Sequence, residues 1–173
     1  MSFEQTPEYI QSINMQPACN EVLTNAFEID LSSINRFSKE DELFILDQKF
    51  HIDVIVTLQN GSTMTGQEKA LSNQFYKYRT FTMEFYQNRF TKEKGEFFKI
   101  ASQFYLHGYS DESGCKFAEW YIFDVPKILD WLKSCKVSSL ESKTKPSTSR
   151  ASFIAIPYDK IPKEFIMYSS KPQ

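Results

Sequence analysis

Three polar side chains stand near the open end of an otherwise apolar hairpin: Asp53, Gln67 and Lys69. A carboxylate oxygen and an amide oxygen are hard ligands of the kind that a divalent cation prefers. Such a cation polarises a phosphate and makes a bound water a better nucleophile. A lysine ammonium can stabilise the charge that develops on the phosphate. The three residue types therefore suit metal-assisted hydrolysis of a phosphate ester, provided that they meet on one face of a sheet.

The hairpin turn decides whether they meet, because residues directly opposite each other in a ladder share a face. A two-residue Asn60-Gly61 turn would place Asp53 opposite Glu68, two like charges. A three-residue loop over 59–61 places Asp53 opposite Gln67 instead and pairs apolar residues on the other face. A bulge in the second strand after a two-residue turn would restore the same facing. The hydrophobic pattern favours the arrangement in which the polar groups gather.

The letters "ID" at 52–53, a hairpin, and "QEK" at 67–69 resemble the PD-(D/E)XK nuclease superfamily. In that family an Asp ends one strand and (D/E/Q)-x-K lies on the next. The resemblance implies a restriction-endonuclease-like fold, DNA as the substrate, and Mg²⁺ or Mn²⁺ as the cofactor. It also leaves a homodimer open, since many such domains cut two strands.

The resemblance implies roles for particular residues. Asp53, Gln67 and Lys69 would form the catalytic set, and the metal ligands would be Asp53, Gln67 and the backbone carbonyl of Glu68. The side chain of Glu68 is expected on the opposite face of the strand. An acid from the first helix sometimes completes such sites, and the candidates here are Glu21 first and Glu28 second.

One departure from the family pattern keeps a second interpretation open. Gln67 stands where the family often has a second acid, which removes one negative charge and should weaken metal affinity. The alternative function is a catalytically weak or inactive nuclease-fold protein that binds nucleic acid or protein. An Asp and a Lys on a hairpin are also commonly a solvated pair. His51 would fall beside Lys69, where a surface histidine is the simplest interpretation.

Basic residues interleaved with aromatic ones follow the hairpin and are candidates for contact with nucleic acid. Phosphate contacts and base stacking use this combination of side chains. Nearby acids dilute the charge, so a solvated charged loop is the competing interpretation. The candidate nucleic-acid-binding residues are Lys77, Arg79, Arg89, Lys92 and Lys94.

The order of predicted elements positions these residues in an α/β (α+β) domain with a mixed central sheet flanked by helices. We expect a single nuclease-like domain over residues 1–173 with a flexible loop at 137–150. The predicted helices cover 7–29, broken at Pro17, and 126–136. The predicted strands cover 43–58, 62–71, 80–86, 117–125 and 152–157. The first of these strands is interrupted by polar residues at 47–49.

Composition narrows the class of protein. A formal net charge of −2 and a pI of about 5.8 argue against coating nucleic acid through bulk charge, but permit a local basic patch. The three cysteines form no CxxC pair and only two histidines accompany them, so a structural zinc site is not expected. Neither a signal peptide nor a membrane span is visible. We therefore expect a cytoplasmic protein with no membrane partner.

Overall fold

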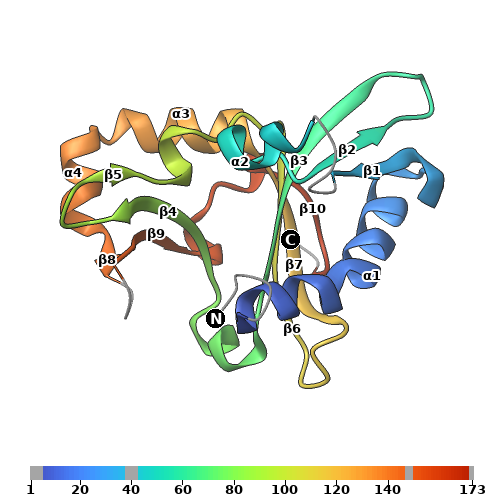
Figure 1. Ribbon diagram of the computed structural model, residues 1–173, viewed down its shortest axis with the longest axis horizontal. Helices are drawn as coiled ribbons and strands as arrows, with labels where there is room; N and C mark the ends of the chain where they lie inside the picture. The colour runs from blue at the N-terminus through green and yellow to red at the C-terminus, as the bar shows by residue number, and fades with distance from the viewer. Residues whose placement is uncertain (1–5, 38–42, 147–149, 172–173) are drawn as a thin grey trace.

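The computed structural model describes residues 6–37, 43–146 and 150–171, whose strands form two sheets (Figure 1). The larger sheet has the order β1-β2-β3-β6-β7-β10, and the smaller one β5-β4-β9-β8. The larger sheet contains β1 (Ile34–Arg36), β2 (Val54–Thr57), β3 (Thr63–Leu71), β6 (Phe104–Ser110), β7 (Phe117–Asp124) and β10 (Ile166–Ser169). The smaller sheet contains β4 (Thr80–Asn88), β5 (Glu93–Lys94), β8 (Lys145–Pro146) and β9 (Ser152–Pro157).

Helices flank both sheets, which confirms the expected mixed α+β class. The α-helices are α1 (Pro7–Phe27), α2 (Phe44–Phe50), α3 (Val125–Ser134) and α4 (Val137–Lys143). Short 3₁₀ turns join the strands: η2 (Leu31–Ser33), η3 (Asn73–Tyr78), η4 (Glu96–Phe98), η5 (Tyr158–Lys160) and η6 (Lys163–Phe165).

The larger sheet is antiparallel except where β3 lies parallel to β6. A parallel pair needs a long crossover connection. Here η3, β4, β5 and η4 form that connection, so half of the smaller sheet is inserted between β3 and β6. The insertion places β4 beside the face of the larger sheet that carries the odd-numbered residues of β3.

A hydrophobic core lies on each face of the larger sheet. Helix α1 packs on one face, and the smaller sheet with α3 packs on the other (Figure 1). The α1 core includes Val54, Val56, Phe104, Leu106 and Ile122. The core between the sheets is rich in aromatic residues and includes Phe81, Phe85, Phe97, Tyr105, Tyr109 and Phe123.

The hairpin adopts the three-residue register that the hydrophobic pattern favours. The Leu58 N–H donates to the Ser62 carbonyl at 2.8 Å, and Gly61 is left-handed with φ of 81°. Val56 pairs with Met64 in the ladder between β2 and β3. The Gly61 conformation explains the turn, because glycine has no Cβ to oppose a positive φ.

Gly66 on β3 lies against an aromatic ring, so a side chain at this position should destabilise the fold. A Cβ built on Gly66 would lie 2.1 Å from Cζ of Phe104. We expect Gly66→Ala to lower the free energy of unfolding by about 1–3 kcal/mol, measured by urea denaturation, because the core is already filled. Thr63→Ala, at an exposed position of the same strand, is the control. An unchanged urea midpoint for Gly66→Ala would contradict this packing.

Pro17 does not break the first helix, contrary to the prediction. Helix α1 continues through Pro17 from Pro7 to Phe27. Proline in a helix interior costs about 3 kcal/mol because it removes a hydrogen bond and crowds the preceding turn. Buried side chains on both sides of it, Met15 and Leu23 among them, pack against the sheet and offset that cost.

Two further segments differ from their predicted structure. Residues 44–50 form helix α2 instead of a strand, because the polar residues at 47–49 interrupt the alternation that a strand requires. The segment 137–150, predicted as a loop, contains helix α4 and strand β8, while 147–149 lie outside the described residues. Leu140 is 6% exposed and packs α4 onto the core between the sheets.

Candidate functional site

Asp53 lies at the start of β2, at the edge of β3. Helix α2 ends at His51, which is left-handed with φ of 50° and turns the chain toward the sheet. The Asp53 N–H donates to the Gly66 carbonyl at 2.9 Å, and its Oδ2 accepts the Glu68 N–H at 2.9 Å. The carboxylate therefore continues the ladder beyond the last strand pair, Val54 with Gly66.

The electrostatic environment of Asp53 disfavours its charged form. Burial raises the pKa of Asp53 well above its usual value, and the negative charges of Asp47 and Glu68 raise it further, against the hydrogen bond from the Glu68 N–H. Burial also raises the pKa of Asp47 on α2. A buried carboxylate that lies beside two other acids is an arrangement that a bound cation would stabilise.

We expect Asp53→Asn to stabilise the protein at neutral pH. A carboxyl whose pKa is raised by folding stabilises the fold below its ordinary value, 3.8 here, and that contribution is lost as pH rises. At pH 7 the amide should therefore raise the free energy of unfolding by about 1 kcal/mol, as substitutions that relieve a destabilised site commonly do. Urea denaturation of both proteins at pH 4 and pH 7 measures this, and an equal difference at both pH values would contradict it.

Gln67 and Lys69 lie on the face of β3 that meets the smaller sheet. In the parallel ladder Gln67 pairs with Tyr105 and Lys69 with His107. Lys69 Nζ lies 3.4 Å from the Thr82 carbonyl and 5.2 Å from the centre of the Phe153 ring. Both side chains are half-buried, so neither is sealed from solvent.

The three predicted catalytic residues are neighbours in the fold but do not bond to one another. No hydrogen bond or ion pair among the described residues joins Asp53, Gln67 and Lys69. Burial raises the pKa of Tyr105 on one face of the sheet and that of Cys19 on the other, and the Asp53 carboxylate adds a smaller contribution to both, as expected for a group in the plane of the sheet. The structure therefore places Asp53 at the strand edge and the other two residues on one adjoining face.

The side chain of Glu68 lies on the α1 face, as the register predicts. Arg36 of β1 binds it with two hydrogen bonds, from Nη2 at 2.7 Å and from Nε at 2.8 Å. In a strand the N–H and C=O of one residue point toward the same neighbour. Because the Glu68 N–H points to Asp53, its backbone carbonyl also points toward that edge.

Glu21, the first candidate for an additional acid, lies on α1, which packs on the face of the larger sheet opposite to Gln67 and Lys69. The face of α1 that packs on the sheet carries Ala18, Cys19 and Val22, and Glu21 is turned to solvent. Glu28, the second candidate, is the exposed C-cap residue of α1. Among the described residues, neither acid has a side-chain bond to the hairpin.

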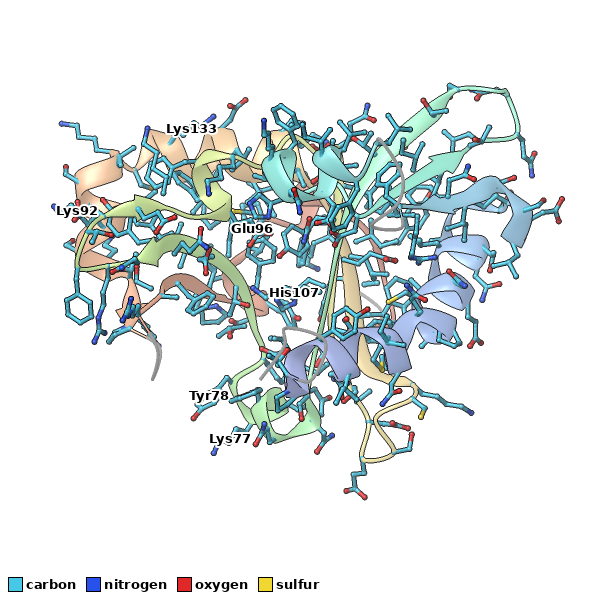
Figure 2. All side chains as sticks on the ribbon, viewed as in Figure 1. Lys77, Tyr78, Lys92, Glu96, His107 and Lys133 are labelled. Atoms are coloured by element: carbon cyan, nitrogen blue, oxygen red, sulfur yellow. The ribbon has the colours of Figure 1, made fainter. Side chains whose placement is uncertain are left out.

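The Gln67 face carries a group of buried polar atoms that make no hydrogen bond. Sequence patterns did not indicate this group. These atoms are His51 Nε2, Gln67 Oε1, Glu96 Oε1 and the Tyr105 hydroxyl. Glu96 is only 4% exposed and lies between the two sheets (Figure 2), where its Oε2 accepts the Glu84 N–H at 3.2 Å. Burial raises the pKa of Tyr105, and Glu96 raises it further.

This polar group is unusual because native proteins leave few buried polar atoms unsatisfied. Each such atom costs about 1–3 kcal/mol. His51 is half-buried, in contrast to the surface position expected for it, and burial lowers its pKa. Glu96 follows the turn at Gly95, and its distance in sequence from the hairpin explains why the motif did not reveal it.

The oxygens of Asp53 and of the adjoining Gln67 face, a place called the corner from here on, satisfy part of what a divalent cation requires. Gln67 Oε1 and Glu96 Oε1 make no hydrogen bond, and the Asp53 carboxylate makes no ion pair among the described residues. Within residues 6–37, 43–146 and 150–171, no three His, Cys, Asp or Glu side chains form a group that could hold a metal ion. A cation here would therefore depend on the Gln67 amide and on the backbone carbonyl of Glu68 as well as on Asp53.

The five candidate nucleic-acid-binding residues fall into two groups at opposite ends of β4. Lys77 and Arg79 lie on or beside η3, before β4, whereas Arg89, Lys92 and Lys94 follow β4 (Figure 2). Nine residues of strand separate the groups by about 30 Å. Arg79 is bound to Glu119 at 2.7 and 2.9 Å, and Lys92 to Glu141 at 3.0 Å. These residues do not form one continuous basic patch.

Comparisons with known proteins found no relative of this chain. No family model, curated protein or solved structure matches it. None of the helices in the described residues has the length and apolar composition needed to cross a membrane. The resemblance to nucleases therefore depends on the hairpin residues and the site around them.

Proposed function

We propose that the protein is a metal-dependent nuclease that hydrolyses phosphodiester bonds in DNA. The observation that carries this proposal is the position of Asp53 at the edge of β3, beside a face that carries Gln67, Lys69 and buried acceptor atoms without partners. Asp53, Gln67 and the Glu68 carbonyl would hold Mg²⁺ or Mn²⁺. When bound, the ion would polarise the phosphate and lower the pKa of a bound water.

The residues of the chain have separate roles in this proposal. Lys69 provides an ammonium group beside the corner, where it can stabilise negative charge on the phosphate. The ammonium lies over the Phe153 ring, 5.2 Å from its centre, which restricts where it can go. Glu96, with one free carboxylate oxygen, can accept a proton or a hydrogen bond from water that enters the corner.

The test is incubation of the purified protein with linear and circular DNA and either Mg²⁺ or Mn²⁺. We expect cleavage that stops when EDTA removes the metal. An absence of cleavage with both metals would remove the catalytic proposal.

The proposed compartment is the cytoplasm. The proposal also includes a homodimer, which gel filtration can test.

The second candidate function is a non-catalytic module on the same scaffold that binds nucleic acid or protein. Two observations favour it: Gln67 replaces an acid, and the described residues contain no group of three conventional metal-binding side chains. Such a module would bind DNA without cutting it. DNA binding that is unchanged by EDTA, together with intact DNA after incubation, would support this candidate over the nuclease.

A further inference from the structure

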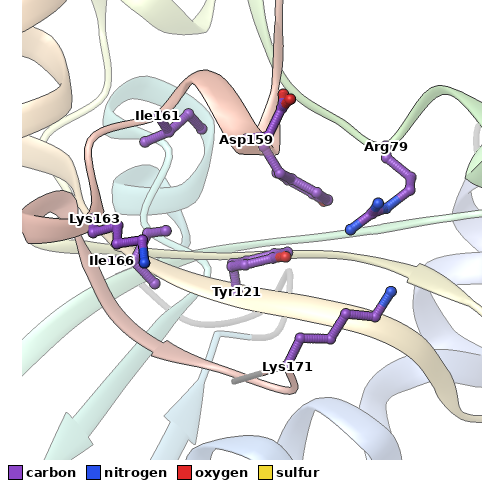
Figure 3. A pocket seen from close by; sticks show the side chains of 8 residues that line it. Arg79, Tyr121, Asp159, Ile161, Lys163, Ile166 and Lys171 are labelled. Carbon is purple, nitrogen blue, oxygen red and sulfur yellow. The ribbon is translucent and has the colours of Figure 1, made fainter. Parts of the chain in front are cut away.

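A cavity of about 250 Å³ lies on the same sheet face as Lys69, between η3, β7 and the chain from η5 to β10 (Figure 3). One row of paired residues across the larger sheet joins Lys69 to the cavity, since Lys69 pairs with His107 and His107 pairs with Tyr121. Two strand spacings separate the ends of that row, or about 10 Å. The residues that line the cavity include Arg79, Tyr121, Tyr158, Asp159, Lys163 and Lys171.

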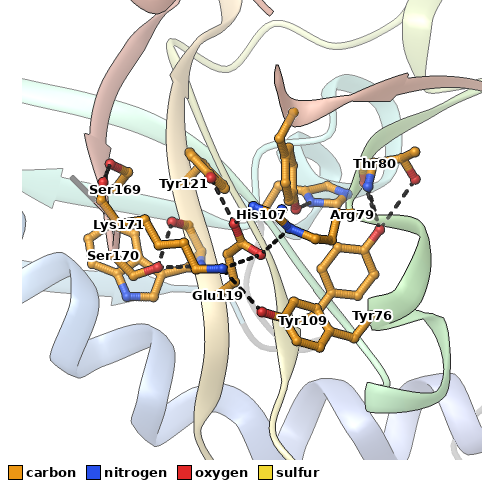
Figure 4. Close-up of polar contacts among 12 residues, drawn as sticks. Tyr76, Arg79, Thr80, His107, Tyr109, Glu119, Tyr121, Ser169, Ser170 and Lys171 are labelled. Carbon is orange, nitrogen blue, oxygen red and sulfur yellow. Dashed lines mark hydrogen bonds and ion pairs between the residues drawn. The ribbon is translucent and has the colours of Figure 1, made fainter. Parts of the chain in front are cut away.

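The rim of the cavity carries a positive charge that a buried carboxylate holds in place. Glu119, fully buried, accepts two hydrogen bonds from Arg79 and pairs with Lys171 at 3.3 Å (Figure 4). These interactions lower the pKa of Glu119 to about 2 against the effect of burial, so it is ionised at neutral pH. With Lys163, the rim has three cations, Arg79, Lys171 and Lys163. Two acids, Asp159 and Glu119, oppose them, so the net charge is positive.

The cations have capacity for another anion. Arg79 uses Nε and Nη2 for Glu119, which leaves the Nη1 protons available. Among the described residues Lys163 makes no ion pair, and its side chain is exposed. Arg79 and Lys171 line one side of the cavity and Lys163 the other (Figure 3), and guanidinium and ammonium groups around one cavity provide positive charge for a phosphate.

The floor of the cavity is aromatic. The rings of Tyr121 and Tyr158 lie 4.3 Å apart, centre to centre. Their hydroxyls bind other residues: Tyr121 donates to Glu119 at 2.8 Å, and Tyr158 lies 2.7 Å from Nδ1 of His107. Because both hydroxyls are held in this way, and Tyr121 is 8% and Tyr158 5% exposed, the tyrosines can offer a ligand only the small part of each ring that lines the cavity. Ring surface stacks on nucleobases with little dependence on sequence.

We infer that this cavity binds a nucleoside monophosphate unit, with the base on the tyrosine floor and the phosphate at Arg79, Lys163 and Lys171. The unit can come from a free nucleotide or from the phosphorylated end of a DNA strand. The first source does not depend on the proposed nuclease function, whereas the second extends it. The cavity is below the size of common drug-sized sites, which suits one nucleotide and not several.

The test is calorimetric titration of the full chain, without metal, with deoxyadenosine monophosphate, deoxyadenosine, and a short single strand with or without a 5′-phosphate. We expect the monophosphate to bind at least tenfold more tightly than the nucleoside. Lys163→Glu should weaken that binding at least tenfold, and Lys171→Ala should weaken it several-fold. Lys116→Glu, an equal charge change at an exposed position in the β6–β7 turn, should leave it unchanged.

The arms of the experiment separate the two sources and the two proposals. Tighter binding of the phosphorylated strand than of the mononucleotide assigns the site to a strand end, and the reverse assigns it to free nucleotide. Equal binding of the nucleoside and its phosphate, or no effect of Lys163→Glu, would overturn the inference. Lys69→Met should retain nucleotide binding in the same titration. Because that titration contains no metal and measures no cleavage, a protein that fails to cut DNA can still show nucleotide binding.

Discussion

Lys69→Met is expected to lower the rate of metal-dependent DNA cleavage by about 10²–10³-fold, the usual loss when one group that stabilises the transition state is removed. Methionine keeps an unbranched side chain of similar length, so the space beside the Phe153 ring stays filled although the contact of the ammonium with that ring is lost. The ammonium alone is then lost. The measurement is the single-turnover cleavage rate at saturating metal.

The matched control for Lys69→Met is Lys116→Met, which removes one exposed positive charge far from the hairpin in sequence. It should retain a cleavage rate close to that of the wild type. Urea denaturation should show that both variants remain folded. Cleavage by Lys69→Met at the wild-type rate would contradict the role given to this ammonium.

Arg79→Ala is expected to lower the free energy of unfolding by about 3 kcal/mol, because it removes the main partner of a fully buried carboxylate. Glu119 would retain Tyr121 and Lys171, but would lose both guanidinium hydrogen bonds. The measurement is chemical denaturation at pH 7.

Lys92→Ala is the control for Arg79→Ala. Its partner Glu141 is about one-third exposed, and exposed ion pairs contribute about 0–1 kcal/mol. A second variant, Arg79→Ala with Glu119→Gln, should recover part of the lost stability because no buried charge remains. Equal losses for Arg79→Ala and Lys92→Ala would show that burial of Glu119 does not control stability.

The hairpin register could be predicted from sequence because local chemistry determines it. Only one register pairs Val54 with Gly66 and Val56 with Met64, and Gly61 permits the left-handed turn that this register requires. Helix α3 was predictable for a similar reason, with a capping residue, Asp124, next to an early proline. In both cases the deciding contacts are close in sequence.

Elements that depend on distant contacts were less predictable. The continuation of α1 through Pro17 depends on packing against strands β2, β6 and β7, which no local pattern records. Helix α4 depends on one buried leucine, Leu140, in a segment that otherwise resembles a loop.

The site was partly predictable for the same physical reasons. Asp53, Gln67 and Lys69 belong to one hairpin, so spacing alone brings them near one another. Glu96 reaches the same corner only because β4, β5 and η4 are inserted between β3 and β6 and fold back on that face. Glu21 was a candidate by helix membership alone, and the rotation of α1 turns it to solvent.

The central claim is that the edge of β3 holds a divalent cation through Asp53, and titration of the protein with Mn²⁺ in a calorimeter tests it most directly. We predict saturable binding to the wild type that is lost in Asp53→Asn, a variant that keeps the acceptor for the Glu68 N–H. Gln67→Glu, which restores the second acid, should bind Mn²⁺ more tightly than the wild type. The absence of binding to the wild type, or equal binding to Asp53→Asn, would contradict the account.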